Sequence, residues 1–145
     1  MKKYLLVLLL LVTPLHAEVY DISKFDLASH KGKVVYLDFW ASWCKPCRES
    51  FPWMNALLNQ YPADKFTIIT VNLDAKSSEM QRFLDQVPVQ FDIYHDPSGT
   101  IAEKFQLEGM PTSYLIDASG KVVAKHIGFY LSKQGDYERE IEELL

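Results

Sequence analysis

The feature that most constrains this chain is a pair of cysteines placed directly after an apolar, β-prone run. Residues 33–40 read Lys-Val-Val-Tyr-Leu-Asp-Phe-Trp, a pattern typical of a central strand that is buried on both faces. Cys44 and Cys47 follow, separated by Lys45 and Pro46, and they are the only cysteines in the chain. Two thiols at this spacing can close a small disulfide ring or hold a metal ion. The spacing alone leaves both options open.

The N-terminus has the pattern of a secretory signal peptide. A basic start is followed by an apolar run over residues 4–12, and Ala17 offers a small residue at a suitable cleavage site. The apolar run is shorter than the roughly 20 residues that span a bilayer. We therefore expect a cleaved signal peptide at 1–17, with an uncleaved membrane anchor as the alternative. The remaining segment, 18–145, is long enough for one domain with a hydrophobic core.

Export would have two consequences for the rest of the chain. Cleavage removes two lysines and no acidic residue, so the formal net charge falls from −4 to −6, which disfavours nucleic acid as a partner. In an oxidising compartment most cysteine pairs are structural disulfides. A disulfide across only two intervening residues constrains the unfolded chain little, so this spacing favours a chemical role.

The remaining pattern predicts a mixed sheet with helices on both faces. The predicted strands are 33–40, 65–73, 91–95, 112–116 and 121–127. The last two form a hairpin, because the residues between them have turn composition. The predicted helices follow the cysteines, cover 77–86, end at Phe105, and run from an Asp136 cap to the C-terminus. Strands and helices thus alternate as in an α/β domain.

Two separated motifs resemble the thioredoxin superfamily. They are Asp38-Phe39-Trp40-Ala41-Ser42-Trp43-Cys44-Lys45-Pro46-Cys47 and Gly109-Met110-Pro111-Thr112. The segment between Asp74 and the second motif has room for a helix and a strand, and with the leader it looks like the TlpA-like branch of periplasmic thiol-disulfide oxidoreductases. The resemblance covers 19–145. It implies a thioredoxin-like fold, a central mixed β-sheet flanked by helices, with a helix-strand insertion before the strand that follows a cis-proline.

The two cysteines are predicted to act as a redox pair. Cys44 is expected at a helix N-terminus, where unpaired N–H groups and the helix dipole stabilise a thiolate. Cys44 is then the exposed nucleophile that forms a mixed disulfide with a partner, and Cys47 is the more buried resolving thiol. A structural or metal-binding pair is the alternative. Strongly oxidising relatives often carry a histidine between the cysteines; Lys45 and Pro46 stand there instead, which favours a reducing or isomerising role.

Asp38 interrupts the apolar run six positions before Cys44. A buried carboxylate costs free energy unless it has a function. Asp38 matches the buried acid of thioredoxins, so the resemblance implies that it exchanges a proton with Cys47. A solvent-facing aspartate on an edge strand is the alternative. Many TlpA-like relatives instead carry a glutamate six positions after the first cysteine; this chain has Ser50 there, and the adjacent Glu49 would point away around the helix.

Three further residues are predicted to bind the substrate. Met110 and Pro111 match the family's cis-proline loop, and the resemblance implies that the Met110 backbone pairs with an extended substrate. An ordinary proline at the start of a strand is the alternative. Trp43, next to Cys44, is expected on the docking surface. Trp40 is expected in the core.

The sequence thus predicts an enzyme, a periplasmic protein-disulfide oxidoreductase that uses no cofactor and acts as a monomer. It would reduce disulfides of exported proteins and be recharged by an electron donor in the membrane, with cytochrome c maturation as one pathway by family analogy. One alternative is a copper or zinc carrier that uses the cysteine pair. Another is a redox-inert adaptor. His30, His95 and His126 are scattered and are predicted to be surface or satisfied side chains rather than ligands.

Overall fold

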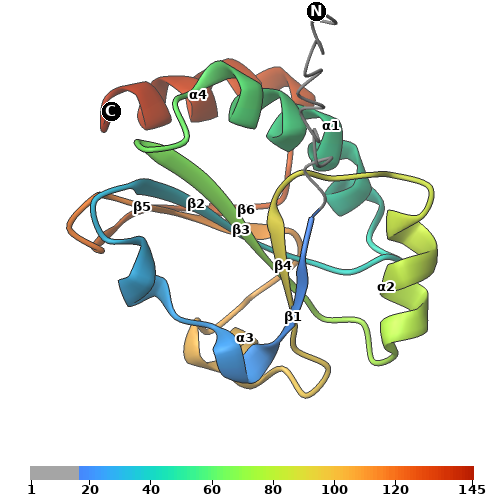
Figure 1. Ribbon diagram of the computed structural model, residues 1–145. Coiled ribbons are helices and arrows are strands. Elements are labelled where there is room, and N and C mark those ends of the chain that lie inside the picture. The colour runs from blue at the N-terminus through green and yellow to red at the C-terminus, as the bar shows by residue number, and fades with distance from the viewer. Residues whose placement is uncertain (1–16) are drawn as a thin grey trace, which may run out of the picture.

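A computed structural model describes residues 17–145 of the chain (Figure 1). All of the predicted signal peptide except its last residue lies outside the described residues, so its cleavage stays a prediction. The strands are β1 (Val19–Asp21), β2 (Val34–Trp40), β3 (Phe66–Asn72), β4 (Asp92–His95), β5 (Thr112–Ile116) and β6 (Val122–Ile127). The α-helices are α1 (Lys45–Gln60), α2 (Ser77–Leu84), α3 (Thr100–Lys104) and α4 (Gln134–Glu142), and short 3-10 helices cover Ile22–Lys24, Leu27–His30 and Leu131–Lys133.

The six strands form one mixed sheet in the order β1-β4-β3-β2-β5-β6. The strands β1, β4, β3 and β2 pair in parallel, whereas β5 pairs antiparallel with both β2 and β6. Every residue of β2 is buried, as its continuous apolar run predicts for a strand covered on both faces. The cysteine motif therefore begins at the end of a central strand.

Helices cover both faces of the sheet. Figure 1 shows α1 and α4 together over one face, while α3 lies on the opposite side. Alternate residues of β2 divide between two core clusters: Tyr36 and Trp40 pack with α1, α2 and α4, and Leu37 and Phe39 pack with α3 and the N-terminal segment. This alternation places the side chain of every second β2 residue, Asp38 included, beneath α1.

The predicted strands and helices are confirmed, with three differences. β1 has only three residues and was not predicted; it pairs with β4 at the sheet edge. The last helix begins at Gln134, so Asp136 lies in its first turn and is not its cap, contrary to prediction. α2 begins at Ser77 as predicted but ends at Leu84, two residues before the predicted end at Gln86. None of these differences moves the cysteine pair.

Within residues 17–145, no helix has both the length and the apolar composition needed to cross a bilayer.

Candidate functional site

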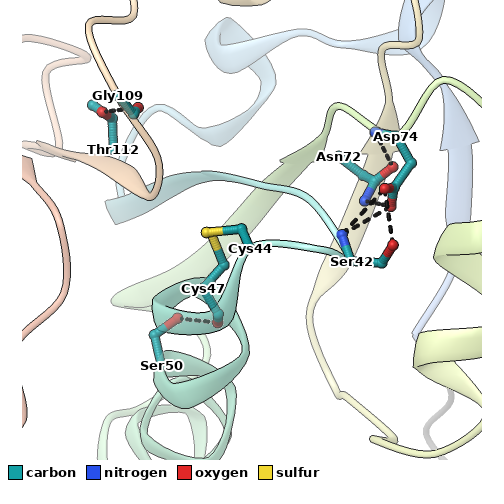
Figure 2. The surroundings of a disulfide bond; sticks show 8 residues. All are labelled: Ser42, Cys44, Cys47, Ser50, Asn72, Asp74, Gly109 and Thr112. Carbon is teal, nitrogen blue, oxygen red and sulfur yellow. Dashed lines mark hydrogen bonds between the residues drawn. A yellow bond between two sulfur atoms is a disulfide. The ribbon is translucent and has the colours of Figure 1, made fainter.

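The two cysteines form a disulfide at the N-terminus of α1 (Figure 2). Cys44 is the N-cap residue and Pro46 lies in the first turn, where its missing N–H breaks no helical hydrogen bond. The Cα atoms of the pair are 5.3 Å apart. Cys44 is 6% exposed and Cys47 is fully buried, so the order of exposure is as predicted. In this disulfide state, however, Cys44 is buried except for one accessible edge, whereas an exposed side chain was expected.

The loop that leads into the pair is held by Asp74, a residue that no sequence pattern singled out. The Asp74 carboxylate accepts hydrogen bonds from the Ser42 backbone N–H at 3.0 Å and from the Ser42 hydroxyl at 2.9 Å. It also accepts one from the Asn72 side-chain amide at 2.8 Å, and Asn72 in turn accepts from the Asp74 backbone N–H (Figure 2). A fully buried carboxylate with several donors is a rigid anchor. It fixes the loop two residues before Cys44.

Replacing Asp74 by alanine is therefore expected to lower the free energy of unfolding by about 2–3 kcal/mol, because the partly buried donors of Ser42 and the buried amide of Asn72 lose their acceptor. Chemical denaturation measures this change. Asp64→Ala, at an exposed position, is the matched control and should change stability by no more than about 0.5 kcal/mol. Equal stability of the two variants would contradict the anchoring role.

Asp38 is buried in the middle of β2, and only 2% of its surface is exposed. It lies between Thr70 of β3 and Ser113 of β5, so the alternative of a solvent-facing edge position is wrong. Among the described residues, no hydrogen-bond donor contacts its Oδ2. Burial without a compensating charge raises the pKa of this carboxyl well above its usual range. Asp38 can thus hold a proton under conditions in which an ordinary aspartate is ionised.

Ser50 occupies the position at which many TlpA-like relatives carry a glutamate, and its hydroxyl does not ionise near neutral pH. Ser50 is buried, and its hydroxyl donates to the Cys47 carbonyl at 2.8 Å (Figure 2). Glu49 is exposed and lies 4.0 Å from Lys45 in a surface pair. Asp38, on the face of β2 that also carries Tyr36 and Trp40, is then the buried acid on the same side of the sheet as Cys47.

The Met110–Pro111 peptide bond is cis, as the resemblance implied. The loop around it is fixed by a hydrogen bond from the Thr112 hydroxyl to the Gly109 carbonyl at 2.7 Å and by one from the Gly128 N–H to the Pro111 carbonyl at 2.7 Å. This loop immediately precedes β5, and β5 is the neighbour of β2 in the sheet. The two motifs recognised in the sequence therefore meet at one end of the sheet.

A cleft of about 900 Å³ runs along the disulfide. Trp43, Cys44 and Pro46 line it on the helix side, and Met110 lines it on the loop side. Its outer wall is the segment from Ala102 to Gly109, which comprises the end of α3 and the loop before Met110. Trp43 is 68% exposed beside the cleft, consistent with the predicted docking position, while Trp40 is fully buried as predicted. The arrangement leaves the Cys44 edge of the disulfide facing a mostly apolar groove.

The described residues contain no group of three or more His, Cys, Asp or Glu side chains arranged to hold a metal ion. The His95 ring contacts the Asp74 carbonyl at 2.8 Å, and the His126 ring contacts Glu140 at 2.8 Å. These histidines have protein partners, as predicted.

Comparisons with known proteins agree with this geometry. A family model for the AhpC/TSA family matches residues 13–125. The thiol-disulfide oxidoreductase ResA of a Bacillus cereus strain is 37% identical over 111 residues, which cover 77% of this chain but just under two thirds (64%) of ResA. The thioredoxin-like protein YneN of Bacillus subtilis is 36% identical over 122 residues, covering 82% of this chain and 71% of YneN.

A solved structure is similar over most of the chain. It is that of a candidate thiol:disulfide interchange protein DsbE from Chlorobium tepidum, with a TM-score of 0.79 and 47% sequence identity, covering 81% of this chain and 84% of that one. This similarity confirms the predicted thioredoxin-like fold, and the relatives confirm the resemblance to thiol-disulfide oxidoreductases. By its sequence and its fold, the chain belongs to the AhpC/TSA family.

Proposed function

We propose that this protein is a thiol-disulfide oxidoreductase that uses Cys44 and Cys47 as its redox pair. The observation that carries the proposal is the disulfide at the N-terminus of α1, with the edge of Cys44 facing a cleft that the cis-proline loop borders. An extended client segment in this cleft would place its own disulfide against Cys44, and the Met110 backbone would pair with it as an added strand. Relatives named for the same activity support the proposal.

The reduced pair would act in two exchange steps. The Cys44 thiolate attacks one sulfur of the client disulfide, and the other client sulfur leaves as a thiolate that takes a proton from water. Cys47 then loses its proton to the Asp38 carboxylate and attacks Cys44 Sγ. This second step closes the Cys44–Cys47 disulfide and releases the client in its dithiol form. The helix N-terminus favours Cys44 as the attacking thiolate, and full burial favours Cys47 as the resolving thiol.

We place this chemistry outside the cytoplasm and in the reducing direction. The leader supports export to the periplasm, and the absence of a histidine between the cysteines supports a reductant. A reductant in an oxidising compartment needs a donor, so we propose a membrane protein that recharges the pair. The clients would be disulfide-bearing exported proteins, with cytochrome c maturation as one pathway suggested by the family. The protein would act as a monomer.

Trapping of mixed disulfides tests the proposal. Cys47→Ser leaves the attacking thiol but removes the resolving one, so it should accumulate covalent complexes with client proteins that a reductant dissolves on a non-reducing gel. The wild-type protein should accumulate few, and the double variant Cys44→Ser/Cys47→Ser should accumulate none. Equal yields of covalent complexes from the Cys47→Ser and double variants would refute covalent exchange. The alternative of a redox-inert adaptor would then remain. Retention of one copper or zinc ion per reduced molecule against a competing chelator would favour the carrier.

A further inference from the structure

Three polar side chains lie in one row across the sheet, next to the buried Asp38. Asp38 of β2 is the direct cross-strand partner of Ser113 of β5, and Ser113 is the direct partner of His126 of β6. Direct partners point to the same face, with Cβ atoms about 4.5–5.5 Å apart. This is the face covered by α1 and α4, where Cys47 is buried. The row therefore starts on the face where Cys47 is buried and leads toward the edge of the sheet.

Two hydrogen bonds and one ion-pair contact connect the outer part of the row. The Tyr36 hydroxyl donates to Ser113 Oγ at 2.8 Å, and Ser113 Oγ lies 3.5 Å from His126 Nδ1, a long contact toward which the hydroxyl proton can turn. His126 Nε2 lies 2.8 Å from Glu140 Oε2 of α4. Glu140 Oε2 is itself buried, but the His126 side chain is 17% exposed and that of Glu140 is 41% exposed, so the outer end of the row lies next to solvent at Glu140.

Ser113 has the capacity to pass a proton. A serine hydroxyl has one proton and two acceptor lone pairs. Tyr36 occupies one lone pair, and burial raises the pKa of Tyr36 well above 10, so this phenol keeps its proton and only orients Ser113. The second lone pair is free to accept from a protonated Asp38, and the hydroxyl proton is free to go to His126 Nδ1. A histidine that gives its Nε2 proton to Glu140 presents Nδ1 as the acceptor.

The opposite direction along the row is closed. On the β3 side, Asp38 has Thr70 as its partner. The Thr70 hydroxyl already accepts from Trp40 Nε1 at 3.1 Å and donates to the Asp92 carbonyl at 3.3 Å. Its only proton is therefore engaged by a backbone acceptor. Of the two flanking strands, only β5 offers an onward path.

We propose that Ser113, His126 and Glu140 form a proton path that joins the buried Asp38 to solvent. The path rests on the proposed function, because it serves the step in which Cys47 closes the ring. Asp38 must be deprotonated before it can take the Cys47 proton. It gives its own proton to Ser113 Oγ, the Ser113 proton goes to His126 Nδ1, and the Nε2 proton leaves through Glu140. Only protons move along this path, because the electron pair of the exchange moves between sulfur atoms.

The titratable groups that face this path come from every element around it. Tyr36 faces it from β2, Cys47 from α1, and Tyr137 and Glu140 from α4, where the Tyr137 ring packs on His126 with centroids 4.8 Å apart. Tyr137 also has its pKa raised, first by burial, so it stays neutral near neutral pH. His126 and Glu140 are left as the groups through which a proton can leave.

The rate of ring closure, measured by stopped-flow absorbance, tests the path. The reduced protein is mixed with an aromatic disulfide whose thiolate product absorbs visible light: Cys44 attack releases the first thiolate, and closure by Cys47 releases the second. His126→Ala should leave the first release unchanged and slow the second about tenfold or more near neutral pH, since positioned proton carriers contribute roughly 10²–10⁴-fold. Added imidazole should restore the second rate. His30→Ala, at a histidine outside the row, should behave as wild type.

His126→Phe separates proton transfer from packing. Phenylalanine keeps the aromatic contact with Tyr137 but carries no proton and leaves no space for imidazole, so closure should stay slow at every imidazole concentration. Ser113→Ala should be slow as well, whereas Ser119→Ala, on an exposed turn, should not. Closure at the wild-type rate in His126→Phe or Ser113→Ala would overturn the path. Loss of the second release in the wild-type protein would instead overturn the proposed function.

Discussion

Replacing Cys44 by serine is expected to abolish reduction of insulin disulfides, with a loss of roughly 10³-fold or more. A serine hydroxyl is not ionised near neutral pH and does not form a mixed disulfide, so the helix N-terminus at this position has no thiolate to stabilise. Cys47 cannot substitute, because it is fully buried, whereas Cys44 is the member of the pair that lines the cleft. The turbidity of precipitating insulin chains measures the rate.

Cys47→Ser provides the comparison for this result. It retains the attacking thiol, so it should still react once with an added disulfide while losing multiple turnover. Both variants lack the Cys44–Cys47 disulfide, and thermal unfolding should therefore match between them within a few degrees. Insulin reduction by Cys44→Ser at the wild-type rate would contradict the assignment of the nucleophile.

The fold could be predicted where the sequence has long, uniform patterns. The apolar runs that became β2 and β3 are seven residues each and buried almost throughout, so their type is readable without tertiary information. β1 has three residues, Val19–Asp21, with exposed and half-buried positions. Its strand conformation comes from pairing with β4, and no local pattern indicates that pairing. The start of α4 was missed for a related reason, because a preceding 3-10 turn at Leu131–Lys133 leads directly into the helix.

The candidate site was predictable only in part. Asp38 could be singled out because a carboxyl group inside an apolar run costs free energy when the run is buried. The structure confirms that Asp38 is buried. Asp74 and Ser113 gave no such signal, since polar residues at strand ends and in short strands are common. Their roles depend on which strand lies beside which, and on a register that the sequence does not encode locally. His126 was predicted to be satisfied, and it is, but its partners come from β5 and α4.

Asp38→Asn should change the pH dependence of stability. Burial raises the pKa of Asp38 in the folded state above the unfolded value of about 4. Below about pH 4 both states are protonated. As the pH rises from there, the unfolded chain releases this proton while the folded protein keeps it, so wild-type stability falls until the folded pKa is passed. Asparagine does not titrate. As the pH rises, the free energy of unfolding of the variant should therefore increase relative to that of the wild type by up to about 1.4 kcal/mol per pH unit.

Urea unfolding of both proteins across this pH range measures the effect. The slope is the diagnostic quantity, because the amide of a buried asparagine has its own constant cost whatever the pH. Asp64→Asn, at an exposed position, should run parallel to the wild type. Parallel curves for Asp38→Asn and the wild type would mean that Asp38 ionises alike in the folded and unfolded states.

The same substitution should slow ring closure by Cys47 by roughly 10²-fold, since the carboxylate that takes the thiol proton is gone. The first exchange step at Cys44 should keep its rate, because that step needs no proton acceptor on β2. Within the proposed path, Asp38→Asn removes the group that His126 serves, so adding His126→Ala to it should cause little further loss. If the two reductions in the ring-closure rate instead multiply in the double variant, the two residues act independently. His126 would then have no part in handling the Asp38 proton.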